Sequence, residues 1–354
     1  MSRKTFLVVG SALLLSGCSI GVPSGTGTSG GSVWKSFDAG ATFIPKVTVS
    51  EEQRIGTVDV VSLVFDPRDP ETAYIGTREN GIFKTTDGAE HWEQLDFPPV
   101  KVYGLTIDRN SGDRMYASGV YSDIAKIYRS DDAGENWKEI YTEPGEGTVI
   151  TALGSNPDVP EVLYAGTSAG VVIKSTNGGE TWKNVIVAEG PVTKVLFHKG
   201  LPEMVTLLVL NQGVAISADG GTTWNEYTAR SIAEFDREKE NISPENISTI
   251  ISDPSGVNGL YAGAKNGLFR SNDSGKTWQA LDVIESSKKF PVRAVAVNPA
   301  NPSEIVYASG NAFYRSVDGG TQWATTELEI DRSVNIIEYE PSRPDIIYFA
   351  LRKF

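Results

Sequence analysis

The sequence predicts an all-β fold made of seven copies of one unit. A short motif, Ser-x-Asp-x-Gly-x-Thr-Trp, recurs along the chain, and the aromatic residues that close it stand at positions 43, 92, 137, 182, 224, 278 and 323. The intervals between them are 42 to 54 residues, and each holds four short runs of strand-forming residues. This period with four strands per unit is typical of β-propeller blades rather than of a helical solenoid. We therefore expect a seven-bladed β-propeller of four-stranded blades.

The N-terminus has the features of an export leader. Basic Arg3 and Lys4 precede an apolar run, residues 6–15, which is too short to cross a bilayer as a mature helix. The run leads into Leu-Ser-Gly-Cys, where Cys18 is the only cysteine of the chain. This tetrapeptide resembles the bacterial lipobox, in which a peptidase cuts before the cysteine and the thiol receives a diacylglycerol; the alternative is an ordinary secretory leader. The resemblance implies a signal peptide at residues 1–17 and lipid attachment at Cys18.

The segment after Cys18 is rich in Gly, Ser and Thr up to residue 32. Such a composition cannot bury a core and is typical of a spacer. We expect residues 18–32 to be a flexible linker and residues 33–354 to form one domain. The anchored domain would lie in the bacterial cell envelope, on the exported (periplasmic or extracellular) side of a membrane.

The strands within one unit follow from its apolar runs and turn residues. In the third unit we expect strands at residues 150–153, 162–165, 171–174 and 181–187. The ends of the domain supply one further blade between them. Third and fourth strands at 33–36 and 42–49 would pair with first and second strands at 334–339 and 346–351. This pairing closes the ring and removes the exposed sheet edges.

The repeated motif has a structural explanation. An Asp side chain can accept hydrogen bonds from its own turn, a Gly can take a positive φ angle, and a Trp buries a large apolar area. A catalytic residue is needed once, whereas this motif occurs seven times. One copy has Asn in place of Asp, which disfavours a calcium ligand set, so we expect no metal and no cofactor. The structural positions are Asp38, Asp87, Asp132, Asn177, Asp219, Asp273 and Asp318.

The two histidines are too few for a zinc site of the usual kind. His91 stands within one copy of the motif, and His198 stands where other units carry Asp or Asn after the first strand. We interpret His91 as an exposed turn residue and His198 as a loop residue.

The motif closely resembles the Asp box, or bacterial neuraminidase repeat (BNR). Propellers with this box include sialidases, xyloglucan-cleaving endoglucanases, sortilin-type receptors and photosystem II assembly and stability factors. The string Phe-Ile-Pro-Lys at 43–46 lacks the arginine of the corresponding sialidase motif. The photosystem factors resemble this chain in blade number, size and lipobox, but that family presents an arginine-rich patch. Fold alone does not choose between these functions.

The charge of the chain limits its partners. Lys and Arg number 32 and Asp and Glu number 45, a net charge of −13. Without the two cations of the leader the balance is 30 against 45, or −15. A surface of this sign repels phosphate backbones, so nucleic acid is excluded as a partner.

A binding site is expected on the face that carries the second-to-third-strand turns and the connections between blades. The candidates there are Arg78, Glu79, Asn80, Tyr121, Asp123, Lys265, Asn266 and Asn311. The longest of these turns would run from Gly119 to Ala125, and an insertion at 229–246 accounts for the longest interval. A glycosidase would need two carboxylates about 5 to 10 Å apart, and the weak candidates for such a pair are Glu79, Asp123, Glu143 and Asp236. Nothing in the spacing selects two of them.

These observations favour a non-catalytic binding or assembly scaffold for a protein or glycan partner. One alternative is a glycoside hydrolase of xyloglucanase or sialidase type that uses two carboxylates of the loop-bearing face. A second alternative is a photosystem II assembly factor-like protein, which predicts a contiguous Arg/Lys patch on that face.

Overall fold

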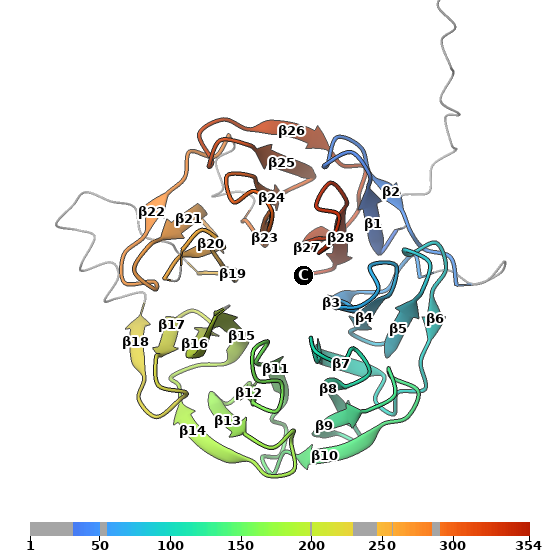
Figure 1. The fold of residues 1–354 in the computed structure, drawn as a ribbon, viewed down its shortest axis with the longest axis vertical. Coiled ribbons are helices and arrows are strands. Elements are labelled where there is room, and N and C mark those ends of the chain that lie inside the picture. Colours follow the sequence, from blue (N-terminus) through green and yellow to red (C-terminus); the bar gives the residue numbers. More distant parts are fainter. Residues whose placement is uncertain (1–30, 50–54, 199, 229–245, 257, 285–290) are drawn as a thin grey trace, which may run out of the picture.

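The fold is an all-β ring of seven blades, as the sequence predicts (Figure 1). The computed structural model describes residues 31–49, 55–198, 200–228, 246–256, 258–284 and 291–354. Each blade is a four-stranded antiparallel sheet, and the first strands of the seven blades surround the central axis. Over these ranges the chain has no helix long and apolar enough to cross a membrane.

The strands follow the chain from the inside of each blade to its outside, except in the last blade. In order from inner to outer strand, the blades are β3 (Val60–Phe65), β4 (Ala73–Thr77), β5 (Ile82–Thr85), β6 (Glu93–Gln94); β7 (Lys101–Ile107), β8 (Met115–Tyr121), β9 (Ile124–Ser130), β10 (Lys138–Thr142); β11 (Ile150–Ser155), β12 (Leu163–Thr167), β13 (Val171–Ser175), β14 (Lys183–Val187); β15 (Val192–His198), β16 (Leu201–Val209), β17 (Gly213–Ser217), β18 (Asn225–Thr228); β19 (Thr249–Ser252), β20 (Leu260–Ala264), β21 (Gly267–Ser271), β22 (Gln279–Ala280); β23 (Ala294–Val297), β24 (Ile305–Ser309), β25 (Ala312–Ser316), β26 (Ala324–Glu327); and β27 (Ser333–Tyr339), β28 (Ile347–Arg352), β1 (Val33–Ser36), β2 (Ile44–Pro45). We number these blades 1 to 7 in the same order.

Blade 7 closes the ring by joining the two ends of the domain. Strand β1 pairs antiparallel with β28, with Val33 opposite Ala350 and Ser36 opposite Ile347. This confirms the predicted closure. The outer strand β2 is shorter than the predicted 42–49, because the chain beyond Pro45 turns to blade 1, where Thr48 O accepts a hydrogen bond of 2.8 Å from Trp92 N.

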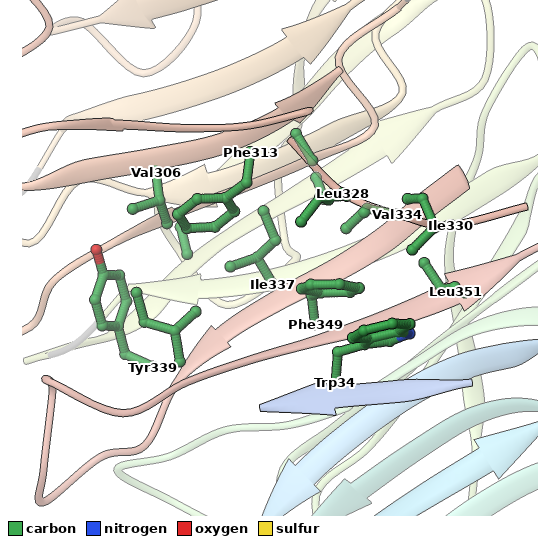
Figure 2. Close-up of a cluster of buried hydrophobic side chains, with 14 residues drawn as sticks. Trp34, Val306, Phe313, Leu328, Ile330, Val334, Ile337, Tyr339, Phe349 and Leu351 are labelled. Atoms are coloured by element: carbon green, nitrogen blue, oxygen red, sulfur yellow. The ribbon is translucent and has the colours of Figure 1, made fainter. Parts of the chain in front are cut away.

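Apolar side chains fill the spaces between neighbouring blades. Between blades 6 and 7, Phe43 takes the place that Trp holds in the other copies of the motif (Figure 2 shows the surrounding cluster). Its ring meets those of Phe313 and Phe349 edge-on, with centroids 4.9 and 4.7 Å apart. Burial of such large rings is the main term that holds adjacent blades together.

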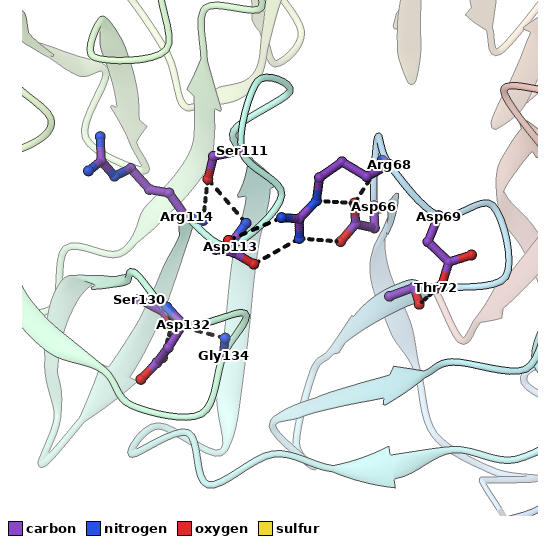
Figure 3. Close-up of polar contacts among 10 residues, drawn as sticks. All are labelled: Asp66, Arg68, Asp69, Thr72, Ser111, Asp113, Arg114, Ser130, Asp132 and Gly134. Atoms are coloured by element: carbon purple, nitrogen blue, oxygen red, sulfur yellow. Dashed lines mark hydrogen bonds and ion pairs between the residues drawn. The ribbon is translucent and has the colours of Figure 1, made fainter.

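Each Asp box is a closed hydrogen-bond network at the turn between a third and a fourth strand. In blade 4, Ser217 Oγ donates to Asp219 Oδ1 at 2.8 Å and accepts from Gly221 N at 2.7 Å, while Thr223 N donates to Asp219 Oδ1 at 2.8 Å. The same contacts join Ser130, Asp132 and Gly134 in blade 2 (Figure 3). The network therefore satisfies backbone N–H groups that no strand partner can reach.

Copies of the motif that depart from the consensus at the Asp or Gly position keep its geometry. Asn177 Oδ1 accepts from Ser175 Oγ at 2.9 Å and from Thr181 N at 3.0 Å, as an Asp would. In blade 1, Ala89 adopts a φ of 73° where the other copies have Gly. His91 there has an exposed side chain whose Nδ1 lies 2.7 Å from Asp87 Oδ2, which agrees with its interpretation as an exposed turn residue.

Lysines of two third strands link their blades to the next blade. Lys174 of blade 3 donates to Gly220 O of the blade 4 Asp box at 2.7 Å, and its ammonium lies 5.4 Å from the Tyr164 ring centroid. Lys35 of blade 7 donates to Gly88 O of blade 1 at 2.8 Å in the same way. These contacts join the Asp-box turns of blades 4 and 1 to the preceding blades.

Two predictions about local structure are wrong. His198 is not a loop residue, because β15 extends to it and its buried ring lies with Nε2 2.9 Å from Thr206 Oγ1. The segment from Gly119 to Ala125 is not a long loop. Strands β8 and β9 continue through it to a two-residue turn, in which Ser122 and Asp123 both have positive φ angles.

The Asp-box carboxylates predict how stability depends on acid. Hydrogen bonds from Thr223, and then from Ser217, lower the pKa of Asp219 to about 2, against about 3.9 in an unfolded chain. A lowered folded-state pKa stabilises the fold above the unfolded value, and that contribution is lost as the pH falls from about 4 towards 2. Asp219→Asn removes the titration and keeps an acceptor oxygen, as Asn177 shows. We expect its melting temperature to fall less than that of the wild type between these pH values.

The matched control is Asn177→Asp, which introduces a titrating carboxylate into the equivalent network of blade 3 and should increase the loss of melting temperature in acid. Scanning calorimetry of the three proteins at pH 7, 4 and 2.5 provides the measurement. Equal acid dependence of all three would contradict the assignment.

Candidate functional site

The two ends of the ring differ in what they present. The Asp-box turns lie on one face, and the turns between second and third strands lie on the other together with the connections between blades. We call the second one the loop face. First strands begin and second strands end on this face, so it also surrounds one mouth of the central channel.

The predicted ligand-face residues lie in turns of four different blades. Arg78, Glu79 and Asn80 form the β4–β5 turn of blade 1, where Thr77 Oγ1 accepts from Asn80 N at 3.0 Å. The remaining five lie in the corresponding turns of blades 2, 5 and 6: Tyr121, Asp123, Lys265, Asn266 and Asn311. The ring brings all eight to one face without gathering them into one cluster.

The carboxylates that the sequence offered for a hydrolase occupy separate connections. Glu79 lies in blade 1, Asp123 lies in blade 2, and Glu143 lies between blades 2 and 3. Glu143 is held by its own loop, because its Oε1 accepts from Gly145 N at 3.0 Å and its Oε2 from Tyr141 OH at 3.1 Å. No hydrogen bond joins any two of these three, and Asp236 lies outside the described residues, as does most of the insertion at 229–246.

Exposed apolar side chains gather on the loop face. The structure describes eleven exposed large hydrophobic residues, and the topology places seven of these on or near this face. They are Val100, Tyr121, Ile124, Val187, Leu210, Ile284 and Phe354. Tyr121 and Ile124 form the tip of the β8–β9 hairpin and are 48% and 45% exposed. At this tip the two exposed apolar side chains are cross-strand neighbours, and adjacent exposed apolar side chains of this kind favour a surface that binds another molecule.

The loop-face mouth of the channel carries three arginines that come from three blades. Arg78 lies in the β4–β5 turn, Arg293 precedes β23, and Arg352 ends β28. The ring of Phe354 lies between two of them, 4.4 Å from Arg293 Cζ and 5.2 Å from Arg352 Cζ. The C-terminal end lies over the middle of the ring (Figure 1). We call Arg78, Arg293 and Arg352 the mouth cluster.

The electrostatics of the mouth cluster are unusual for this chain. Burial lowers the pKa of Arg293, and burial together with the nearby charge of Arg78 lowers the pKa of Arg352. Within the described ranges, neither Arg293 nor Arg352 forms an ion pair, and Arg352 Nε is buried without a hydrogen-bond partner. Arg332, by contrast, lies between Asp59 and Asp331, at 3.7 and 3.5 Å. Sequence reasoning named Arg78 and missed the other two, which no motif marks.

Charged groups also face one another inside the channel. Lys194 on β15 and Glu338 on β27 belong to blades 4 and 7 and interact across the ring. Desolvation lowers the pKa of Lys194 and raises that of Glu338, since it disfavours both charged forms, although Glu338 keeps an exposed surface. The channel wall is therefore polar, and both signs of charge are present on it.

A shallow pocket beside blade 4 holds two further carboxylates that the sequence did not single out. Glu189 and Glu226 line it with Gln212, over a floor formed by Val209, Val214 and Ala215. Glu189 lies in the connection between blades 3 and 4, and Glu226 lies on β18, so no local spacing in the sequence relates them.

Comparisons with known families agree with the resemblance drawn from the motif. The model described as "Sortilin, neurotensin receptor 3" matches residues 125–256, and the model "Photosynthesis system II assembly factor YCF48" matches residues 195–341. Each covers less than half of the chain. A comparison with curated protein sequences gives no match.

Solved structures share the fold at low sequence identity. The xyloglucanase of family GH74 from Xanthomonas campestris superposes with a TM-score of 0.66 and 18% identity, over 84% of this chain and 51% of that one. YCF48 bound to D1 peptide gives a TM-score of 0.63 and 15% identity, over 86% and 97%. YCF48 from Cyanidioschyzon merolae gives 0.62 and 17%, over 83% and 95%. The chain thus spans about half the length of the xyloglucanase and nearly all of the YCF48 structures, and these likenesses show the fold.

Proposed function

We propose that the protein is a lipid-anchored propeller of the cell envelope that binds a protein partner on its loop face without catalysing a reaction. The observation that carries the proposal is the group of exposed apolar side chains on that face, above all the tip of the β8–β9 hairpin. An exposed aromatic residue on a rigid hairpin is a typical centre of a protein interface. The YCF48 structure with a bound peptide has the same fold, which is consistent with such a role.

The position of the N-terminal end supports the proposed anchor. Gly31 and Ser32 precede β1, a third strand, and therefore lie at the loop face. Twelve residues lie between Cys18 and Gly31, and the thirteen Cα-to-Cα steps that join the two, at about 3.5 Å each, span at most roughly 45 Å. A lipid on Cys18 would hold the loop face within that distance of the membrane, where a membrane-associated partner would be within reach.

Replacing the proposed lipid attachment residue should release the protein. We expect Cys18→Ser to move most of the protein from the membrane fraction to the soluble exported fraction, because the acyl chains that bury about 0.8 kcal/mol per CH₂ would be missing. Fractionation followed by immunoblotting measures this, with Ser19→Ala as a neighbouring control that should stay with the membrane. A membrane fraction unchanged by Cys18→Ser would refute the anchor.

Contact at the hairpin tip can be tested in living cells. A photo-crosslinking amino acid placed at position 121 or 124 should yield a discrete crosslinked species. The same amino acid at position 317 serves as a control, since Val317 is 57% exposed but belongs to an Asp box on the opposite face. Adding Ile124→Asp should reduce the position 121 product at least tenfold, because a charge at an apolar contact weakens binding. Equal crosslinking from both faces would contradict the proposal.

A glycoside hydrolase is the second candidate, favoured by the Glu189 and Glu226 pocket and by the likeness to xyloglucanases. Under the scaffold proposal, the purified protein releases no more sugar from xyloglucan or a polysaccharide panel than Glu189→Gln or Glu226→Gln does. Release that either substitution lowers by 100-fold or more would establish the hydrolase and overturn the scaffold.

A further inference from the structure

We infer that the mouth cluster is a binding site for a peptide carboxylate, supplied by an acidic side chain or a chain end. The inference rests on the proposed binding role of the loop face and names the chemical group that one part of that face recognises. It depends on the positions of Arg78, Arg293 and Arg352 and on their lack of ion-pair partners among the described residues.

Three arginines from different blades come together at the mouth of the channel. The three arginines belong to blades 1, 6 and 7, and the Phe354 ring bridges two of them at 4.4 and 5.2 Å. Arg78 N donates to Asp59 O at 2.9 Å and Lys353 N donates to Asp59 Oδ1 at 2.8 Å, so the β4–β5 turn and the end of β28 meet at Asp59, and the charge of Arg78 lowers the pKa of Arg352. Gathering like charges is unfavourable unless an anion compensates them.

The second step is the absence of internal partners. The chain has more carboxylates than cations, and most other described arginines pair with Asp or Glu, namely Arg68, Arg114, Arg129, Arg270, Arg315, Arg332 and Arg343. Over the described ranges the mouth cluster forms no such pair. Asp59 acts on Arg352 at longer range, but Asp59 accepts from Lys353 N and faces Arg332.

The third step is the unmade hydrogen bond of Arg352. Its Nε is buried without an acceptor, and leaving a buried donor unpaired is unfavourable. A carboxylate at the mouth would accept from this edge of the guanidinium. Arginine presents its N–H groups as a planar fork that matches two carboxylate oxygens, and the Phe354 ring lies within cation–π distance of both Arg293 and Arg352.

The surroundings favour a peptide over a polyanion. The net charge of the chain is negative, which disfavours ligands that carry many charges. The tip of the β8–β9 hairpin, with Tyr121 and Ile124, lies on the same face and offers apolar contacts for other side chains of a peptide. A small depression beside Arg293 is lined by Pro291, Gly310 and Ser333, so the surface is hollowed next to one arginine of the cluster.

The test uses the purified mature protein in detergent and fluorescein-labelled peptides. The probe is an acidic hexapeptide, Gly-Leu-Asp-Tyr-Glu-Leu, with a free C-terminal carboxylate. One counterpart is amidated at the C-terminus, and another has Asn and Gln in place of Asp and Glu. Fluorescence anisotropy should show binding of the probe. If the amidated peptide no longer binds, the C-terminal carboxylate is the group that is recognised. If the peptide with Asn and Gln no longer binds, the acidic side chains are recognised.

The double variant Arg293→Gln with Arg352→Gln should weaken binding at least tenfold with an unchanged melting temperature. Arg293→Lys should show part of that loss, since it keeps the charge and removes the fork. The control is Arg109→Gln, because Arg109 also lacks an ion pair among the described residues but follows β7 on the opposite face. Its affinity should equal that of the wild type.

Three results would overturn the inference: equal affinity for a peptide that has neither kind of carboxylate, equal affinity of the double variant, or an equal loss with Arg109→Gln. Stronger competition by inorganic phosphate than by acetate would identify a phosphate site instead. If the peptides fail while crosslinking at position 121 persists, the carboxylate site is wrong and the proposed function stands.

Discussion

The pairing of β1 with β28 is the constraint on which the rest of the structure depends. Every blade buries both faces against its neighbours, so an open ring would expose the apolar surfaces of blades 1 and 6 together with two sheet edges. The two halves of blade 7 come from opposite ends of the domain and have the longest sequence separation of any pair of strands. The Asp boxes and the cations between blades stabilise turns locally, but closure makes them parts of one ring.

The same pairing determines what stands at the mouth of the channel. Because β28 ends on the loop face, Arg352 and Phe354 lie at that mouth of the channel. Because β1 starts on the loop face, Gly31 lies on the same side of the ring. Arg332 fixes this junction by donating to Gly31 O, Gly56 O and Val58 O at 3.0, 2.8 and 2.7 Å. The end of the chain nearest the proposed anchor and the mouth cluster are therefore on one face.

The sequence predicts the fold far better than the site, for a physical reason. Blade number, Asp boxes and ring closure depend on residues close together in the chain or on counting strands, and the structure confirms the architecture. The mouth cluster combines Arg78, Arg293 and Arg352 from three blades, which become neighbours only after closure. The error at Gly119–Ala125 arose because Ser122 and Asp123 take positive φ angles without Gly, which concealed a tight hairpin.

Because of the arginines at the mouth, the net charge of the chain does not by itself predict which partner binds there. A balance of −15 after the leader describes the long-range field, which is screened over about 10 Å at 0.1 M salt. Recognition at the mouth acts over hydrogen-bond distances, where two half-buried guanidinium groups and one unmet N–H determine the local preference. An acidic protein can therefore exclude nucleic acid by its overall charge and still present one site that selects a single carboxylate.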